Sequence, residues 1–509
     1  MRSFDTILDK VYGRKISDFL LNTSGNFKTK FAKSAFWAFF LKFLTKSVGF
    51  IRTLILARIL LPSDFGLMGI ALLSLSFMET ISSTGFEQAL IQKKGKTEKY
   101  LSSVWTANLI RSLALFVIII IFAPFIALFF NSPSLTSILR VIALGIIIYG
   151  LTNVKILYFQ KDLEFKKHFY YQFSGILAEF GVSITLALLL QNVWALVFGL
   201  LAGNFVRLAA GFLLYPWKPK IEFCFGKLKE LFSFGRWVLG TNILGFLLIQ
   251  GDDLLVGKML GTSSLGLYQM AYRTSNITTT EVSHVINQIS FPTLAKLQTN
   301  QEKVQATYLR ILQFISAISF PLGCLIIFLA SDFVKLFLTA NWFLMILPMQ
   351  ILAVWGLLRA ISACNGTLFQ ACGKPQIETK LQLFRFLIML LLIFPFMARW
   401  GTSGAAFAVL LAGFFILPFS LYQVKMTIKL RFRRILKTLL PAGLGSLISL
   451  FVLFLLKSFI LVKTDFLNFF GLAFAGIFAY LIFLFIYDNI FGEHIFNNFR
   501  KKINKFFAE

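Results

Sequence analysis

The sequence predicts an all-α integral membrane protein with about fourteen transmembrane helices, and three observations support this fold class. First, 57% of the 509 residues are hydrophobic and only 14% are charged, well below the charged share of soluble domains. Second, the apolar residues form runs of about twenty, the length of a helix that crosses the hydrocarbon core. Third, lysines and arginines gather between alternate runs. Helices are expected because lipid offers no partner to backbone groups.

The predicted spans follow one another through short connections, without the polar linkers that separate soluble domains. In chain order they cover residues 34–60, 66–90, 101–130, 137–160, 169–190, 193–215, 232–260, 264–292, 308–330, 341–371, 376–399, 402–424, 437–460 and 466–490. The expected organisation is a basic cytoplasmic tail (1–33), an N-lobe of spans 1–6 (34–215), a connector and C-lobe of spans 7–12 (216–424), spans 13–14 (425–490) and a second basic tail (491–509).

The basic residues set the orientation. With the N-terminus in the cytoplasm, 34 of the 50 lysines and arginines fall in cytoplasmic segments and four fall outside. This positive-inside pattern predicts an even number of spans and places both termini in the cytoplasm. The same distribution accounts for most of the net charge of +28. A nucleic-acid-binding protein needs one clustered basic face, so that class is excluded.

The N-terminal tail and the positions of the cysteines and histidines give further expectations. Phe4, Ile7, Leu8 and Val11 are spaced like one face of a short amphipathic helix lying on the membrane. No apolar run resembling a signal peptide precedes residue 34. The four cysteines form no CxxC pair and the three histidines are scattered, so we expect neither a metal site nor a cofactor.

A weak internal repeat divides the spans. Residues 57–68 and 257–268 match at an offset of 200, with identical residues at Leu60/Leu260, Ser63/Ser263, Gly66/Gly266 and Leu67/Leu267. A second echo, at an offset of 210, pairs Phe159-Gln160 with Phe369-Gln370. Span 1 then corresponds to span 7 and span 4 to span 10, so both copies have the same orientation. Parallel repeats of this kind are typical of transporters with a site near the midplane between the halves.

Several sequence blocks resemble a known family. They are LARILLPSDFGL (56–67), GFEQALIQ (85–92), DDLLVGKMLG (252–261), LGLY (265–268), Phe291-Pro292 and NGTLFQACGKP (365–375). Together they are similar to the polysaccharide transporter family, which includes the colanic acid and O-antigen flippases. The similarity runs from about residue 34 to about residue 425, and spans 13 and 14 share only its hydropathy.

This resemblance implies a fold and a function. It places the chain in the multidrug/oligosaccharidyl-lipid/polysaccharide exporter superfamily, whose members have two six-helix lobes facing each other in a V. It implies export of a lipid-linked oligosaccharide on an undecaprenyl-diphosphate-type carrier, from the inner to the outer leaflet of a bacterial inner membrane, by alternating access. Membrane lipids, a polysaccharide polymerase and glycosyltransferases are the expected partners, with no nucleic acid.

Ionisable residues inside spans are costly and therefore mark candidate sites. Arginine suits a diphosphate because its planar fork binds two oxygens. We expect the substrate cavity to be lined by cations and by the polar residues of span 8, namely Arg52, Arg273, Arg359, Asn276 and Thr279. Ion pairs buried between helices are the alternative for these arginines. Lys42, Arg111 and Arg385 are nearer cytoplasmic ends, where they can extend to the interface.

The acidic residues within spans are candidates for coupling or gating, with a proton or Na⁺ as the coupling ion. They are Asp252, Asp253, Glu281 and Glu179. Hydrogen bonding between helices is the alternative role for Glu179 and Glu281. Arg52 and Asp252 occupy equivalent repeat positions with opposite charge, which suggests a pairing that forms in one conformation only.

Two other functions remain as alternatives. A cation-coupled multidrug exporter of the same superfamily would have a smaller, more acidic and more aromatic cavity, whereas the intramembrane arginines favour an anionic substrate. A membrane glycan polymerase would need large outer loops with catalytic residues, and the outer loops of this chain are short. The sequence therefore predicts a transporter and no enzyme.

Overall fold

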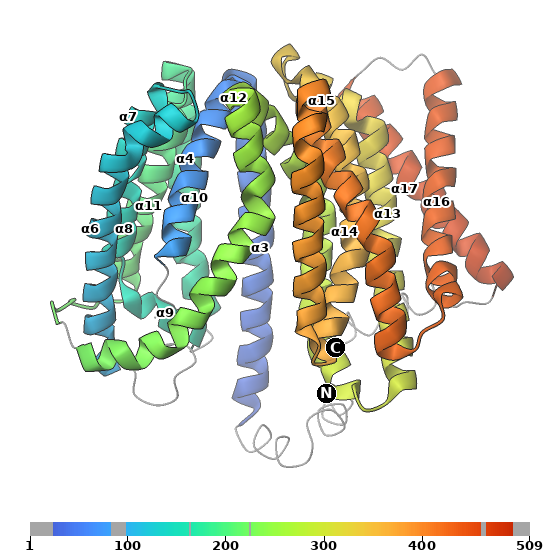
Figure 1. The fold of residues 1–509 in the computed structure, drawn as a ribbon, viewed down its shortest axis with the longest axis horizontal. Coiled ribbons are helices and arrows are strands. Elements are labelled where there is room, and N and C mark those ends of the chain that lie inside the picture. Colours follow the sequence, from blue (N-terminus) through green and yellow to red (C-terminus); the bar gives the residue numbers. More distant parts are fainter. Residues whose placement is uncertain (1–23, 83–97, 162–163, 223–224, 460–464, 492–509) are drawn as a thin grey trace. The chain divides into compact units, whose positions relative to one another are not determined.

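The computed structural model describes residues 24–82, 98–161, 164–222, 225–459 and 465–491. Every element within these ranges is helical (Figure 1). Some side chains on described helices, including those of 24–39 and 277–285, lie outside the description. The predicted amphipathic helix of the N-terminal tail and the 85–92 block also lie outside the described residues.

The described helices are those of a multi-pass membrane protein. Within the described ranges, nine helices are long and apolar enough to cross a bilayer. This agrees with the predicted all-α membrane class. The count of fourteen spans and the arrangement of lobes in a V stay predictions.

The chain divides into two compact units that we call the N-terminal unit (residues 24–60 and 70–247) and the C-terminal unit (61–69 and 248–491). The helices of the N-terminal unit are α3 (Ser24–Ile59), most of α4 (Pro62–Ile81), α6 (Glu98–Phe129), α7 (Ser134–Ile142), α8 (Leu144–Gly150), α9 (Leu157–Lys161), α10 (Phe165–Leu190), α11 (Trp194–Leu214) and the start of α12. Helix α10 packs against α11 and α3, and α6 packs against α7 and α8.

The helix of the fourth predicted span is interrupted by a turn. Residues 137–160 were expected to form one helix, but the apolar helical stretch runs over Ser134–Gly150 and the chain then turns. Asn153 is the physical reason, because its side chain holds the turn in place. Its Nδ2 donates to the carbonyls of Gly211 and Tyr215 at 3.1 and 2.7 Å, and its Oδ1 accepts from the Lys155 amide.

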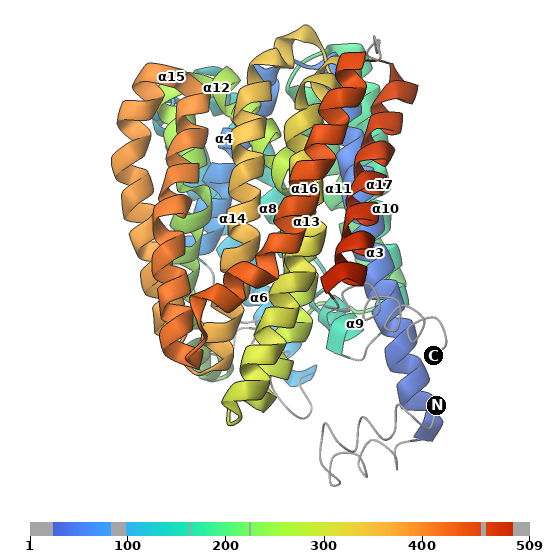
Figure 2. The same cartoon turned by 90° about the vertical axis from the view of Figure 1, so that its right-hand side faces the viewer.

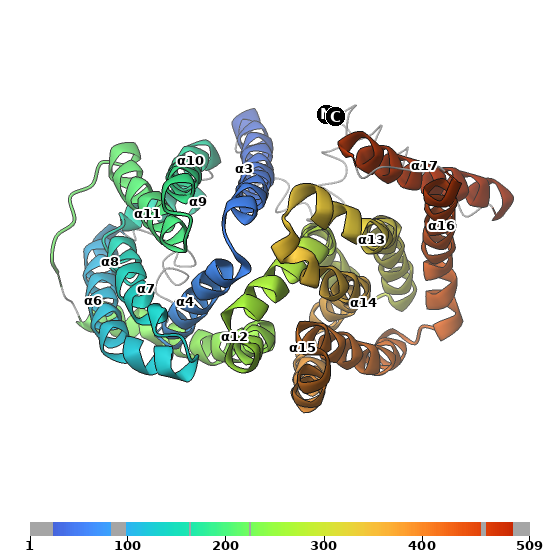
Figure 3. The same cartoon turned by 90° about the horizontal axis from the view of Figure 1, so that it is seen from above.

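The C-terminal unit contains most of α12 (Phe225–Leu297), followed by α13 (Gln301–Phe337), α14 (Ile346–Ala371), α15 (Pro375–Ile428), α16 (Phe432–Phe459) and α17 (Phe466–Phe491). Helix α14 lies between α15 and α13, and α16 and α17 lie beyond α13 (Figures 2 and 3). Lys457 of α16 binds Asp332 of α13 at 2.5 Å, which ties α16 to this unit.

Helices α12 and α15 are each interrupted at one glycine. They contain 73 and 54 residues, far more than the roughly twenty that cross a bilayer. Gly261 (φ 82°, ψ −179°) and Gly401 (φ 55°, ψ −131°) adopt backbone angles that side-chain-bearing residues avoid. Each long helix is therefore two helical segments joined at a glycine, near the places where the hydropathy predicted span boundaries.

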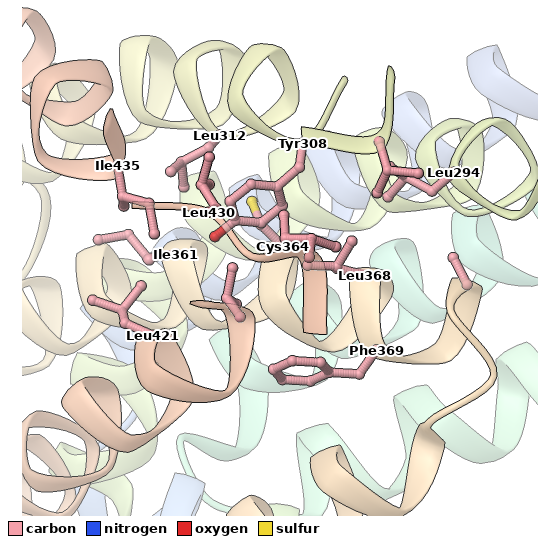
Figure 4. Packing of buried hydrophobic residues seen from close by; sticks show 14 of the residues in the cluster. Leu294, Tyr308, Leu312, Ile361, Cys364, Leu368, Phe369, Leu421, Leu430 and Ile435 are labelled. Carbon is pink, nitrogen blue, oxygen red and sulfur yellow. The ribbon is translucent and has the colours of Figure 1, made fainter. Parts of the chain in front are cut away.

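The core of the C-terminal unit combines apolar packing with one polar network. Leu312, Ile361, Leu368 and their neighbours on α13, α14 and α15 are buried together (Figure 4). Within this core Asn365 Oδ1 accepts from the Tyr308 hydroxyl at 2.6 Å, and its Nδ2 donates to Ser420 Oγ at 2.8 Å. Asn365 is fully buried, so this polar network lies inside the core of the unit.

The two copies of the repeated turn contact each other inside the C-terminal unit. A Cβ at Gly66 would lie 1.7 Å from the carbonyl oxygen of Thr262, and one at Gly266 would lie 1.9 Å from that of Pro62. Both pairs are related by the repeat offset of 200 residues. The helix break also falls at equivalent positions, just before Pro62 and at Gly261. The matching glycines therefore let two backbones touch.

Candidate substrate and coupling sites

Arg52 and Glu179 form an ion pair in the N-terminal unit, between α3 and α10. Their side chains are 21% and 16% exposed, and Arg52 Nε is buried without a hydrogen-bond partner. Glu179 therefore serves as a partner between helices in this conformation, which was the alternative to its predicted coupling role. The predicted pairing of Arg52 with Asp252 in another conformation stays a prediction.

Arg111 lies inside the same unit. Its Nη1 donates to Ser82 Oγ at 3.1 Å, and the charge of Arg111 acts on Glu79 of α4. The sequence predicted that this arginine can extend to the cytoplasmic interface, and this stays a prediction. The structure shows that it links α6 to the end of α4.

Asp252 and Asp253 are each held by a side chain from the other side of the Gly261 break. The Tyr268 hydroxyl donates to Asp252 Oδ2 at 2.8 Å, and Gln269 Nε2 donates to Asp253 Oδ2 at 3.1 Å. Tyr268 is fully buried and Asp252 nearly so. Two neighbouring carboxylates in an apolar interior repel each other, so binding a proton or cation here lowers the cost of burying them.

A second polar group surrounds Arg359 of α14. Arg359 Nη1 donates to the Tyr272 hydroxyl at 2.9 Å. Arg385 of α15 lies nearby, with its guanidinium 5.2 Å from the centre of the Trp355 ring and its Nη2 3.4 Å from the Leu248 carbonyl oxygen. Arg385 was expected to extend to the interface, but the structure turns it over an indole inside the unit.

The remaining predicted residues lie on the second segment of α12. Asn276 is buried, and its Nδ2 donates to the Leu352 carbonyl of α14 at 3.5 Å. Arg273 is exposed. The side chains of Thr279 and Glu281 lie outside the described residues, so their predicted roles in binding and coupling stay predictions.

Sequence reasoning missed several members of these groups. The predicted site residues did not include Tyr268, Gln269, Tyr272 or Trp355. One signal was available for Gln269, because it occupies the repeat position of Gly69. A Cβ at Gly69 would lie 2.3 Å from the Gln269 amide oxygen, so the small residue in one copy makes room for the large one in the other.

These groups suit charge binding better than covalent chemistry. In the C-terminal unit, Asp252 and Asp253 have different hydrogen-bond partners from Arg359 and Arg385. No activated nucleophile is found among the residues named above. Within the part of the chain that the structure describes, His, Cys, Asp and Glu form no cluster of three or more that suits a metal ion. The arrangement can hold an anion at its arginines and exchange a cation at its carboxylates.

Comparison with known proteins supports a transport role. Residues 55–347 match the model of a family described as "Polysaccharide biosynthesis protein". The lipopolysaccharide biosynthesis protein WzxC of Escherichia coli K12 is 24% identical over 392 residues, covering 75% of this chain and 78% of WzxC. The succinoglycan biosynthesis transport protein ExoT of Rhizobium meliloti is 26% identical over 267 residues, covering 52% of this chain and 54% of ExoT.

A solved structure shares the fold. The structure described as "Lipid II flippase MurJ, inward closed conformation" superposes with a TM-score of 0.73 at 18% identity, covering 90% of this chain and 99% of that chain. At this identity the likeness is one of fold.

Proposed function

The chain belongs to the polysaccharide biosynthesis protein family, and from this premise we propose that it flips a polyprenyl-diphosphate-linked oligosaccharide from the inner to the outer leaflet by alternating access. Like its relatives it is a transport protein and not an enzyme. The proposed substrate is an oligosaccharide repeat unit on an undecaprenyl-diphosphate-type carrier, for surface polysaccharide such as O-antigen or exopolysaccharide.

The main support for this proposal is the environment of Arg359. It lies on a helix of 26 residues that is mostly buried within an apolar unit, and its hydrogen-bond partner is the neutral Tyr272 hydroxyl. A guanidinium is costly to bury without an anion. A diphosphate provides that anion, whereas a cationic drug would be repelled. The geometry therefore favours lipid-linked saccharide over the multidrug alternative.

We assign coupling to the pair Asp252 and Asp253. Both carboxylates accept hydrogen bonds from residues beyond Gly261, so a proton or Na⁺ arriving at them competes with Tyr268 and Gln269. Ion binding would then loosen the contact between the two segments of α12. Such a local change can bias a two-state transporter, because only differential binding shifts a conformational equilibrium.

The proposed setting is the cytoplasmic membrane of a bacterium, with both termini in the cytoplasm. Glycosyltransferases build the substrate on the inner leaflet and a polymerase consumes it on the outer leaflet, so both are proposed partners. These assignments rest on the charge distribution of the sequence and on the family, because positively charged segments are retained on the cytoplasmic side.

Deletion of the gene tests this function. Without the flippase, complete lipid-linked repeat units should accumulate on the inner leaflet and surface polysaccharide should be lost. The measurement is extraction of lipid-linked sugars combined with their accessibility to an impermeant label in intact and lysed cells. The gene carrying Arg359→Gln should restore polysaccharide poorly, and the gene carrying Arg399→Gln, an exposed arginine, should restore it fully.

Two results would contradict the proposal. Accumulation of single repeat units on the outer leaflet would indicate a polymerase. Normal polysaccharide together with increased sensitivity to cationic drugs would indicate the multidrug exporter.

A further inference from the structure

Two arginines on adjacent helices of the C-terminal unit lie close enough to interact. Arg359 is on α14 and Arg385 is on the first segment of α15, which packs against α14. Arg359 follows Trp355 by four residues, one turn of α14, and the Arg385 guanidinium lies 5.2 Å from the centre of the Trp355 ring. Two like charges in an apolar interior raise the free energy of the unit unless something offsets them.

The groups that hold these arginines are mostly neutral. Arg359 is held by the Tyr272 hydroxyl, and Arg385 by the Leu248 carbonyl and the face of Trp355. Neither arginine forms an ion pair with any residue that the structure describes. The charges of Asp252 and Glu378 act on Arg385 from a longer distance, without occupying its donors.

Most N–H donors of the two arginines remain available. A guanidinium offers five N–H groups, and each of these side chains uses one in a hydrogen bond to a described residue. The Nε atoms of Arg52 and Arg111 are buried without hydrogen-bond partners, whereas no nitrogen of Arg359 or Arg385 is. Each nitrogen of this pair therefore either has a hydrogen-bond partner or keeps some exposure.

Trp355 fixes the position of Arg385. The indole is 3% exposed and lies against Gly413 of α15, where a Cβ would come within 1.9 Å of the ring. A side chain at position 413 would displace the indole and the guanidinium stacked on it. Such preorganisation lowers the entropy lost when a ligand binds.

We propose that Arg385 and Arg359 together bind the diphosphate of the lipid carrier, an inference that rests on the proposed function. A diphosphate presents oxygens on two phosphorus atoms, and two guanidinium forks can each bind a pair of them. Its negative charge offsets the repulsion between the arginines. Arg385 thus joins the predicted substrate residues Arg52, Arg273 and Arg359.

A binding experiment tests this site in the full chain. The wild-type protein in lipid nanodiscs is titrated with farnesyl diphosphate, farnesyl monophosphate, farnesol and inorganic pyrophosphate by calorimetry. Arg385→Gln and Arg359→Gln should each weaken farnesyl diphosphate binding about 10- to 100-fold, the range for a lost hydrogen bond between charged groups. Arg385→Lys keeps the charge without the fork and should give an intermediate loss. Arg399→Gln, an exposed arginine on the same helix, should bind like wild type.

The outcomes of this experiment distinguish an error in the role of Arg385 from an error in the proposed function. If Arg385→Gln binds farnesyl diphosphate as tightly as wild type while Arg359→Gln does not, the role of Arg385 is wrong and the proposed function stands. If wild-type protein binds none of the farnesyl phosphates, the proposed function fails as well. If pyrophosphate binds as tightly as farnesyl diphosphate, the site takes a free anion and the lipid assignment is wrong. A normal elution profile for Arg385→Lys excludes misfolding as the cause of a loss.

Discussion

At the scale of single residues, the intramembrane charges have different surroundings. Arg52 is paired with Glu179, whereas Arg359 and Arg385 are held by hydroxyl, carbonyl and indole groups. The first arrangement mainly stabilises helix packing in this conformation. The second leaves positive charge available to a ligand. Arginine therefore has two different roles in this chain, depending on whether its partner is a carboxylate or a neutral group.

The ion pair between Arg52 and Glu179 gives a prediction at this scale. Glu179→Gln leaves the Arg52 guanidinium in an apolar environment without its counter-charge, so the melting temperature should fall. Arg52→Gln should lower it too, and the double variant should lose less than the sum, with a coupling energy of about 1–3 kcal/mol.

The control for this comparison of single and double variants is the exposed pair of Glu164 and Lys167. Glu164 Oε2 and Lys167 Nζ lie 2.8 Å apart, and the two side chains are 37% and 49% exposed. Glu164→Gln should leave the melting temperature unchanged, because exposed ion pairs contribute little. Additive effects of the Arg52 and Glu179 substitutions would show that the pair makes no specific contribution.

At the scale of elements, glycines decide where the long helices break and where two of them touch. Gly261 and Gly401 adopt positive φ and interrupt α12 and α15, whereas Gly66 and Gly266 allow close approach. The repeat matched Gly66 with Gly266, and the structure shows that each lies against a backbone carbonyl of the other copy. The match between these glycines thus reflects a packing requirement.

This contact gives a prediction for Gly66→Ala and Gly266→Ala. Each added methyl would come within 2 Å of a carbonyl oxygen, so the two backbones must separate, at a cost of about 1–3 kcal/mol or more. A lower melting temperature and reduced surface polysaccharide are expected. Gly443→Ala, on a helix where nothing lies within 4 Å of the new Cβ, is the matched control and should be close to wild type. Equal melting temperatures for all three variants would refute the contact.

At the scale of the whole molecule, orientation follows from charge and can be measured directly. Arg399 and Arg433 are both exposed and belong to an outer and a cytoplasmic segment respectively in the predicted topology. In a chain without native cysteines, Arg399→Cys should react with an impermeant maleimide in cells whose inner membrane is intact. Arg433→Cys should react only after lysis of that membrane. The reverse pattern would invert the predicted topology.

The sequence predicted the membrane class, the transport family and several of the charged residues that the structure gathers. It placed Arg359, Asp252 and Asp253 among the site residues because charges are costly in lipid. It did not find Arg385, which lies near the end of its predicted span and looked like an interfacial residue. It also could not foresee that Asn153 would hold a turn within the fourth predicted span, because that depends on carbonyls of Gly211 and Tyr215.

The amino-acid sequence by itself determined that this chain crosses a membrane, and it predicts which side its basic segments face. Both properties follow from transfer of residues between water and lipid, which depends on composition and local order. Only the tertiary structure decided which charge meets which partner, because helices far apart in sequence supply Glu179 to Arg52 and Tyr272 to Arg359. Pairing of that kind depends on helix packing, and it separates the arginines that stabilise the fold from those available to a substrate.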